Sequence, residues 1–351
     1  MTGAIVATDY YTWNDLSMAM TRRSFALAAG ASILVAARAG RSSARRKEVA
    51  IVLAPTNLGL RPEGGAQTGT WRAPQSLLDA GLAAALGAVE VVRLERPVYD
   101  FSAQAGTRIR NGLSIRDFSL ALAKRVHTIL AQDRFPVVVG GDCSVLLGGL
   151  YGSRLAGGRG LVHVDGHNDF YHPGNYDTAS RLGSVAGMDL ALVSGRGETL
   201  LTEWPQVTSP LAADEDIVQV GQRDATDEQE DHIPDTAIAQ LTVQRAHVLG
   251  IQAAASSVIE MLEARSLNKV WLHVDFDVLD QAVMPAVDSP GSPGLNFEQL
   301  SALISALCAS GYIAGADFAI YDPARDPAAR YARPLVRCIA RGVRGQARVH
   351  S

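Results

Sequence analysis

Acidic and imidazole side chains follow two of the most apolar stretches of this chain, at the ends of "RGLVHVDGH" and "VWLHVDFD". Along each stretch these side chains occupy every second position, so in an extended chain they point to one side. Four carboxylates buried together repel one another unless cations neutralise them. The pattern therefore predicts bound metal, most economically two ions, with candidate ligands Asp165, His167, Asp169, Asp275 and Asp277.

A third segment, "VVVGGDCSVLLGG" at 137–149, runs from small aliphatic residues through two glycines into Asp142 and Cys143. A thiolate ligand at Cys143 would favour Zn²⁺, Fe²⁺, Co²⁺ or Ni²⁺ over the harder Mn²⁺. A nucleophilic thiol would need a base, and the nearby His167 is already assigned as a ligand. We interpret Cys143 first as a metal ligand, with nucleophile and inert packing as the alternatives.

The elements that must position these residues alternate between strand and helix. Seven nearly continuous apolar runs are typical of strands covered on both faces, at 48–55, 89–94, 135–142, 159–167, 216–224, 270–277 and 313–322. Helical patterns lie between several of them, at 73–87, 115–133, 250–265 and 296–311, the last with Asn296 as a cap. This order predicts an α/β fold, a three-layer α/β/α sandwich with a mainly parallel sheet and its site at the carboxyl ends of the strands.

Composition limits the kind of partner. The 351 residues are 47% hydrophobic and 19% charged, with a formal charge of −4 from 32 basic and 36 acidic side chains. Long runs of Lys or Arg are missing after the N-terminal segment, so we expect a small-molecule substrate and no nucleic acid. The three cysteines form no CxxC pair, which argues against a disulfide framework or a zinc ribbon.

Residues 1–47 differ from the rest of the chain. Within them, 20–40 places Arg22 and Arg23 before an Ala-rich apolar stretch, the layout of a twin-arginine export signal. A disordered extension before a later start is the alternative. The stretch is too short and too weakly apolar to span a membrane stably. The sequence leaves the compartment open, with the cytoplasm favoured over export, and assigns 48–345 to one metallohydrolase domain.

Three dispersed segments, "GGDCS", "DGHNDF" and "DFDVLDQAVMPAVDSPGSPGL", resemble the signature segments of the ureohydrolase family, which includes arginases and agmatinases. The resemblance covers about residues 48–340. It implies a three-layer α/β/α domain that assembles as a trimer or hexamer. It also implies two Mn²⁺ ions and a metal-bridging hydroxide that attacks an amidine carbon.

The resemblance further implies a role for each candidate ligand. Asp165 and Asp275 would bridge the two metals. Asp169 and Cys143, where the family usually has histidine, would complete one site, and His167 and Asp277 would complete the other. Asp277 would also accept and donate the catalytic proton.

Two positions depart from arginase. The histidine of an HG pair is replaced by Ala186, and a glutamate three residues after the last core-strand aspartate is replaced by Ile320. We therefore expect arginine to be a poor substrate and less basic hydroxyguanidino or formimino compounds to be better ones. The alternative hypothesis is a protein of this fold that binds or regulates without amidinohydrolase activity.

Several other polar residues have both a functional and a structural interpretation. In the loop 170–177, contacts to substrate or a role in shaping the loop are open for His172, Asn175, Tyr176 and Asp177. We interpret His163 and His273, each two residues before a metal-motif aspartate, as satisfied core residues rather than supports for the ligands. For Arg72, Arg108 and Arg110 we favour surface salt bridges over recognition of a substrate carboxylate.

Overall fold

The computed structural model describes residues 46–223, 233 and 236–346. The candidate export signal at 20–40 lies outside the described residues. None of the helices in the described ranges combines the length and the apolar character that crossing a membrane requires.

The described residues form one eight-stranded sheet in which every neighbouring pair of strands is parallel. Its order is β2-β1-β3-β8-β7-β4-β5-β6. The strands are β1 (Val49–Ala54), β2 (Glu90–Arg93), β3 (Phe135–Gly140), β4 (Leu161–Val164), β5 (Ile217–Val220), β6 (Ala239–Leu241), β7 (Val270–Asp275) and β8 (Ile313–Ala319). The central strands β3, β8, β7 and β4 are buried throughout, which explains their continuous apolar sequences.

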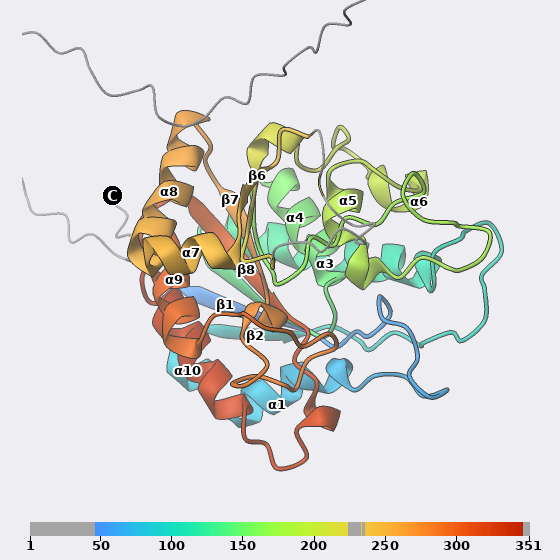
Figure 1. The fold of residues 1–351 in the computed structure, drawn as a ribbon, viewed down its shortest axis with the longest axis horizontal. Coiled ribbons are helices and arrows are strands. Elements are labelled where there is room, and N and C mark those ends of the chain that lie inside the picture. The colour runs from blue at the N-terminus through green and yellow to red at the C-terminus, as the bar shows by residue number, and fades with distance from the viewer. Residues whose placement is uncertain (1–45, 224–232, 234–235, 347–351) are drawn as a thin grey trace, which may run out of the picture. The chain divides into compact units, whose positions relative to one another are not determined.

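Helices pack on both faces of this sheet (Figure 1). One layer contains α1 (Ala73–Asp79), α2 (Leu82–Leu86), α7 (Val243–Leu249), α8 (Ile251–Ala264), α9 (Phe297–Ala309) and α10 (Ala332–Val343). The other contains α3 (Gly112–Ala131), α4 (Val145–Leu155), α5 (Asp189–Val193) and α6 (Thr199–Thr202). The predicted three-layer α/β/α sandwich is therefore confirmed.

The seven predicted strands are all present, and Asn296 caps α9 through a capping box with Gln299. The single helix predicted at 73–87 is wrong, because Gly81 adopts a positive φ of 99° and separates α1 from α2. Strand β6 and helices α4, α5, α6, α7 and α10 were not expected from the sequence. Helix α4 is buried along most of its length, so it lacks the polar face that makes a helix recognisable from its periodicity.

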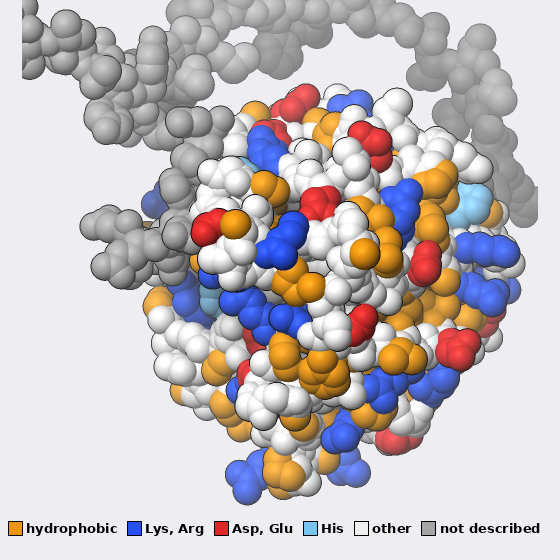
Figure 2. Space-filling model, turned by 90° about the vertical axis from the view of Figure 1, so that its right-hand side faces the viewer, with side chains coloured by type: hydrophobic (Ala, Val, Ile, Leu, Met, Phe, Trp, Pro, Cys, Tyr) orange, Lys and Arg blue, Asp and Glu red, His pale blue; other side chains and the backbone are white. Residues whose placement is uncertain are grey.

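One face of the molecule carries a mixture of charged and apolar side chains (Figure 2). On the face shown in Figure 2, Lys and Arg side chains are interspersed with Asp, Glu and apolar side chains. They form no continuous basic surface on that face of the described residues. Charges of both signs therefore lie side by side on this face.

Candidate metal centre

A cavity of about 390 Å³ lies at the carboxyl ends of the central strands. Five of the six predicted metal ligands line it, namely Cys143, His167, Asp169, Asp275 and Asp277. The sixth, Asp165, is fully buried just beneath them, where its carboxylate lies close to those of Asp275 and Asp277. The structure thus brings all six predicted ligands together.

Strand register explains this convergence. His163 of β4 pairs with His273 of β7, and His273 pairs with Asp317 of β8, so these three side chains form a row across one face of the sheet. Two residues further along the same strands, Asp165 and Asp275 leave the sheet on that same face. The centre therefore has two levels, an upper set (Asp165, His167, Asp169, Asp275, Asp277) and a lower set (His163, Asp189, His273, Asp317).

Short hydrogen bonds hold the upper set in place. The backbone N–H of His167 donates to Asp165 Oδ1 at 2.7 Å, and that of Asp277 donates to Asp275 Oδ1 at 2.6 Å. The ring atom His167 Nδ1 lies 2.9 Å from Asp277 Oδ2, while the backbone of Gly166 donates to Asp277 Oδ1 at 3.1 Å. These contacts fix the carboxylates before any ligand binds.

The charges of the upper set are poorly compensated by the protein alone. Burial, followed by repulsion from neighbouring carboxylates, raises the pKa of Asp165, Asp169 and Asp275 well above the ordinary range. Asp277 raises the pKa of His167 to about 9. Burial alone would raise the pKa of Asp277, but the charge and hydrogen bond of His167, together with Arg223, lower it. Without a cation, protons must therefore neutralise most of this set.

The donor atoms fit divalent ions. Asp165, His167 and Asp169 present ligand atoms within 4.8 Å of one another, and so do Asp165, Asp275 and Asp277. Asp165 Oδ2 is buried and has no hydrogen-bond partner among the described residues, although its carboxylate belongs to both groups. A buried oxygen without a partner is costly, and a metal shared by the two groups would satisfy it.

Cys143 lies where the chain leaves β3 and enters α4. Two residues earlier the chain needs a glycine, because a Cβ at Gly141 would lie 1.6 Å from the carbonyl oxygen of Thr56. The Cys143 thiol donates to Asp275 Oδ2 at 2.8 Å. Burial, and then the charges of Asp275 and other carboxylates, raise the pKa of Cys143 well above its ordinary value. These surroundings oppose a free thiolate and therefore disfavour a nucleophile, while the ligand and the inert-packing interpretations both stay open.

The lower set corrects our interpretation of the two strand histidines. His163 and His273 are fully buried and stack with ring centroids 4.8 Å apart. As core residues they are only half satisfied, because one ring nitrogen of each contacts a carboxylate whereas His163 Nδ1 and His273 Nε2 have no hydrogen-bond partner among the described residues. Asp189, which starts α5 and is also fully buried, completes this set and was missed from the sequence. An aspartate within the apolar run "GMDLALV" and the repeated "HVD" of both strands were the available signals.

The loop 170–177 contributes one of the four predicted substrate contacts to the cavity wall, Tyr176, together with Tyr171. Asn175 Oδ1 accepts from the backbone of His172 at 2.8 Å, and its Nδ2 donates to the carbonyl of Phe170 at 2.9 Å. The exposed Asp177 accepts from the backbone of Ala179. His172, Asn175 and Asp177 are not among the residues that line the cavity, and their contacts stabilise the loop.

Both departures from arginase, Ala186 and Ile320, lie on the cavity wall. Ile320 has a φ of 74°, which breaks strand alternation. Asp322, two residues further on, is not among the residues that line the cavity and instead accepts from the backbone of Gly69 and Ala324.

The arginines that line the cavity are Arg61 and Arg181, which the sequence had not indicated. Of the three arginines considered from the sequence, Arg72 lies beside a different hollow and Arg108 donates to the carbonyls of Thr178 and Ala179. Arg110 donates to the carbonyl of Phe101.

The parallel sheet covered by helices on both faces and the carboxylate-rich centre at its strand ends define the class, a three-layer α/β/α protein whose donor set suits divalent metals. Comparison with known proteins agrees. The arginase of Staphylococcus aureus (strain COL) is 28% identical over 297 residues, covering 80% of this chain and 92% of that protein. The native structure of the Bacillus caldovelox arginase has a TM-score of 0.74 at 24% identity, covering 85% and 98% of the two chains. A formimidoylglutamase structure from Bacillus subtilis has a TM-score of 0.64 at 17% identity, covering 86% and 87%.

The family assignment itself comes from a sequence profile of the arginase family, which matches residues 47–341. The chain therefore belongs to the arginase family, and it is a metal-dependent hydrolase of C–N bonds in linear amidines.

Proposed function

We propose that this protein hydrolyses a linear amidine that is less basic than arginine and carries an anionic group, with two divalent metals held by the upper set and Cys143. The observation that carries the proposal is the contrast between two parts of one cavity. Its floor collects the predicted metal ligands, and the rest of its lining includes the arginines Arg61 and Arg181 together with Glu63 and Asp288.

The two arginines support an anionic substrate. Burial, and then repulsion from Arg181 and Arg110, lower the pKa of Arg61. The Arg181 guanidinium also lies 5.4 Å from the Tyr171 ring centroid and 5.1 Å from that of Tyr176. A substrate carboxylate bound between Arg61 and Arg181 would relieve the repulsion between like charges and could be held by bidentate hydrogen bonds.

The wall supports a weakly basic amidine. Ile320 and Ala186 place apolar surface where arginase would have a carboxylate and an imidazole. A guanidinium would be desolvated there without a charged partner, at a cost of about 1.5–3 kcal/mol for one missing charged hydrogen bond. An N-hydroxyguanidine or a formimino group is less basic, so its desolvation in this part of the cavity costs less free energy.

The metal ligands are assigned as follows in this proposal. Asp165 and Asp275 would be shared by both ions, Asp169 and Cys143 would complete one site, and His167 and Asp277 would complete the other. Mn²⁺ is expected from the family, while the thiolate of Cys143 favours Zn²⁺, Fe²⁺, Co²⁺ or Ni²⁺. When bound, two such ions supply an activated water as nucleophile and Lewis acidity toward the amidine.

The protein supplies the proton transfer and the orientation. Although burial alone would raise the pKa of Asp277, the charge and hydrogen bond of His167 lower it and keep the carboxylate ionised, so Asp277 would accept a proton from the attacking water in exchange for its contact with His167. The same proton is then passed to the departing nitrogen as the C–N bond breaks. Arg61 and Arg181 hold the distant end of the substrate, and the aromatic wall of Tyr171 and Tyr176 keeps it extended toward the floor.

A paired substrate screen tests this proposal. The metal-loaded full chain would be assayed for release of urea, hydroxyurea or formamide from guanidino, N-hydroxyguanidino and formimino acids and from their decarboxylated analogues. We expect the less basic acids to be preferred, and Arg61→Gln to raise KM about tenfold for the acids alone. Arg72→Gln, beside a different hollow, is the matched control. Equal turnover of acids and decarboxylated analogues would overturn the anionic-substrate assignment.

A further inference from the structure

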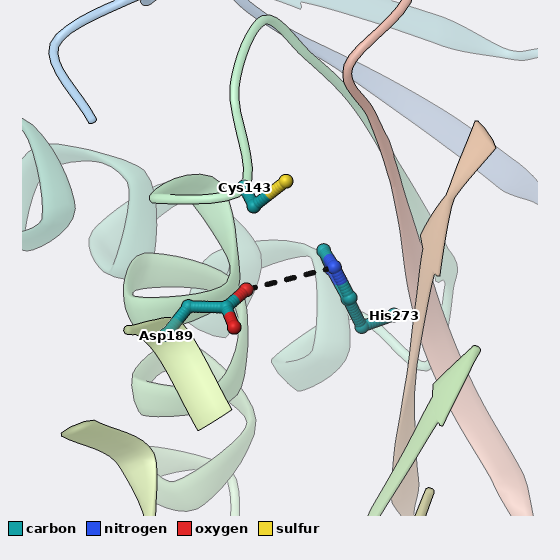
Figure 3. Close-up of side chains that lie close together, drawn as sticks. All are labelled: Cys143, Asp189 and His273. Atoms are coloured by element: carbon teal, nitrogen blue, oxygen red, sulfur yellow. Dashed lines mark ion pairs between the residues drawn. The ribbon is translucent and has the colours of Figure 1, made fainter. Parts of the chain in front are cut away.

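Cys143 of the cavity lining converges with two side chains that lie beneath it, Asp189 and His273, each from a different element, as Figure 3 shows. Cys143 comes from the turn between β3 and α4, Asp189 from the start of α5, and His273 from β7. Their ligand atoms lie within 4.8 Å of one another, and all three residues are buried. Asp189 and His273 belong to none of the family's signature segments used above.

Two of the converging atoms lack hydrogen-bond partners. Asp189 Oδ2 and His273 Nε2 are both buried without a hydrogen-bond partner among the described residues. They lie 3.6 Å apart, too far for a hydrogen bond with each other. The contact is an ion pair when His273 is protonated (Figure 3), but it leaves both buried atoms without a hydrogen bond. Burying them in this state is costly, and a cation bound between Asp189 and a neutral His273 would satisfy both.

The surroundings orient both residues toward that point. His273 Nδ1 lies 2.5 Å from Asp317 Oδ1, and the other oxygen of Asp317 accepts from the indole N–H of Trp271. On the other side, His163 Nε2 lies 3.3 Å from Asp189 Oδ1, which leaves Oδ2 for another partner. A carboxylate that holds one ring nitrogen while the other faces an acceptor cluster is the arrangement found at metal-binding histidines.

We propose that Cys143 Sγ, Asp189 Oδ2 and His273 Nε2 bind a thiophilic divalent ion, of the Zn²⁺ or Co²⁺ type, beneath the cavity floor. The inference takes from the proposed function only that Cys143 is a metal ligand. Under the proposed function, the other ligands of the Cys143-bound ion were Asp165, Asp169 and Asp275. In this inference they are instead the Asp189 carboxylate and the His273 imidazole of the lower set. The Asp165, His167, Asp169, Asp275 and Asp277 side chains then serve the more exposed metal position.

Charge and donor type favour this assignment. One thiolate and one carboxylate neutralise a divalent cation, and the neutral imidazole adds no charge, which suits a fully buried site. The upper set would instead place a thiolate beside three carboxylates, an excess of negative charge around one ion. Sulfur and nitrogen donors also suit Zn²⁺ better than Mn²⁺.

Zinc X-ray absorption of the unmodified full chain, loaded first with Mn²⁺ and then with a single equivalent of Zn²⁺ so that the more exposed position with its His167 holds Mn²⁺, tests the site without relying on a variant. The ligands assigned from the family give the thiolate-bound ion no histidine, whereas the lower set gives it one. We expect sulfur and imidazole scattering from the same zinc. The Co²⁺-loaded chain should show a thiolate-to-metal charge-transfer band.

Variants sharpen the test. Asp189→Asn and His273→Gln should each lose about one equivalent of Zn²⁺ per chain and the thiolate–Co²⁺ band. Asp317→Asn should keep the band while weakening Zn²⁺ binding about tenfold to a hundredfold, because Asp317 only orients His273. Cys308→Ser, which changes a buried cysteine of α9, is the matched control and should alter neither readout.

Two results would overturn the inference, and they differ in what they imply for the proposed function. Sulfur without imidazole at zinc, together with full metal in Asp189→Asn and His273→Gln, would leave Cys143 with the upper set and the proposed function intact. Absence of sulfur at zinc, with full metal in Cys143→Ser, would remove Cys143 as a ligand and contradict both proposals.

Discussion

The upper and lower sets of the centre have similar donors but different surroundings. Upper side chains border the cavity, and backbone N–H groups of Gly166, His167 and Asp277 hold their oxygens. Lower side chains are closed off from solvent and leave Asp189 Oδ2, His163 Nδ1 and His273 Nε2 without partners among the described residues. From this difference we infer separate roles, in which the upper set contacts substrate and water while the lower set, with Cys143, binds a metal.

The largest effect is expected in the upper set. With the ligands assigned under the proposed function, Asp165→Ala or Asp275→Ala should empty both metal positions, whereas with the lower-set ligands the ion bound by Cys143, Asp189 and His273 should remain. We expect amidine hydrolysis to fall by at least about a thousandfold because the activated water is lost. Elemental analysis and the release assay would measure the two effects. Near-normal metal content in either variant would show that the residue is not shared.

Cys143 lies between the two sets, so changing it separates them. Cys143→Ser should lose one ion preferentially and keep the other, whereas Cys143→His should shift the metal preference toward Mn²⁺. Metal content after loading with mixed Mn²⁺ and Zn²⁺ would measure both effects. If Cys143→Ser retains two ions with unchanged preference, the cysteine only fills space.

The substrate side of the upper set is tested by Ile320→Glu. Restoring a carboxylate should improve the specificity constant for arginine relative to less basic analogues by roughly tenfold to a hundredfold, or about 1.5–3 kcal/mol. Ile320→Gln controls for the loss of the β-branched residue at a positive φ. Efficient arginine hydrolysis by the unmodified protein would mean that another group binds the guanidinium.

The smallest expected effect is on stability after metal removal. His167 and His273 have folded pKa values of about 9 against an ordinary value of 6.5. Burial lowers the pKa of His273, but Asp317 and then Asp189 more than offset this. A raised folded pKa contributes stability that is complete below the unfolded pKa and is lost as pH rises through the folded value.

The metal-free protein should therefore unfold at a temperature roughly 5 °C or more lower at about pH 9 than at about pH 6. Raised carboxylate pKa values in Asp165, Asp169 and Asp275 act in the same direction. Thermal unfolding by circular dichroism, with and without added Zn²⁺, would measure the shift. An opposite slope in the metal-free protein would show that protons do not replace the cations in the centre.

The sequence by itself determined the α/β fold and brought the six predicted ligands to one edge of the sheet. It could do so because buried parallel strands read as continuous apolar runs and parallel strands end at the same edge. Residues two apart at those ends, such as Asp165 and His167, then had to share a face.

Only the tertiary structure decided the lower set and the arginines of the cavity lining. Asp189 belongs to a short helix with no periodic signal, and its meeting with His163 and His273 depends on how α5 packs over β4 and β7. The orientation of Ile320 followed from a positive φ that strand alternation does not predict. Arg61 and Arg181 come from loops that converge only after folding, because long-range packing, rather than local sequence spacing, sets the distances between them.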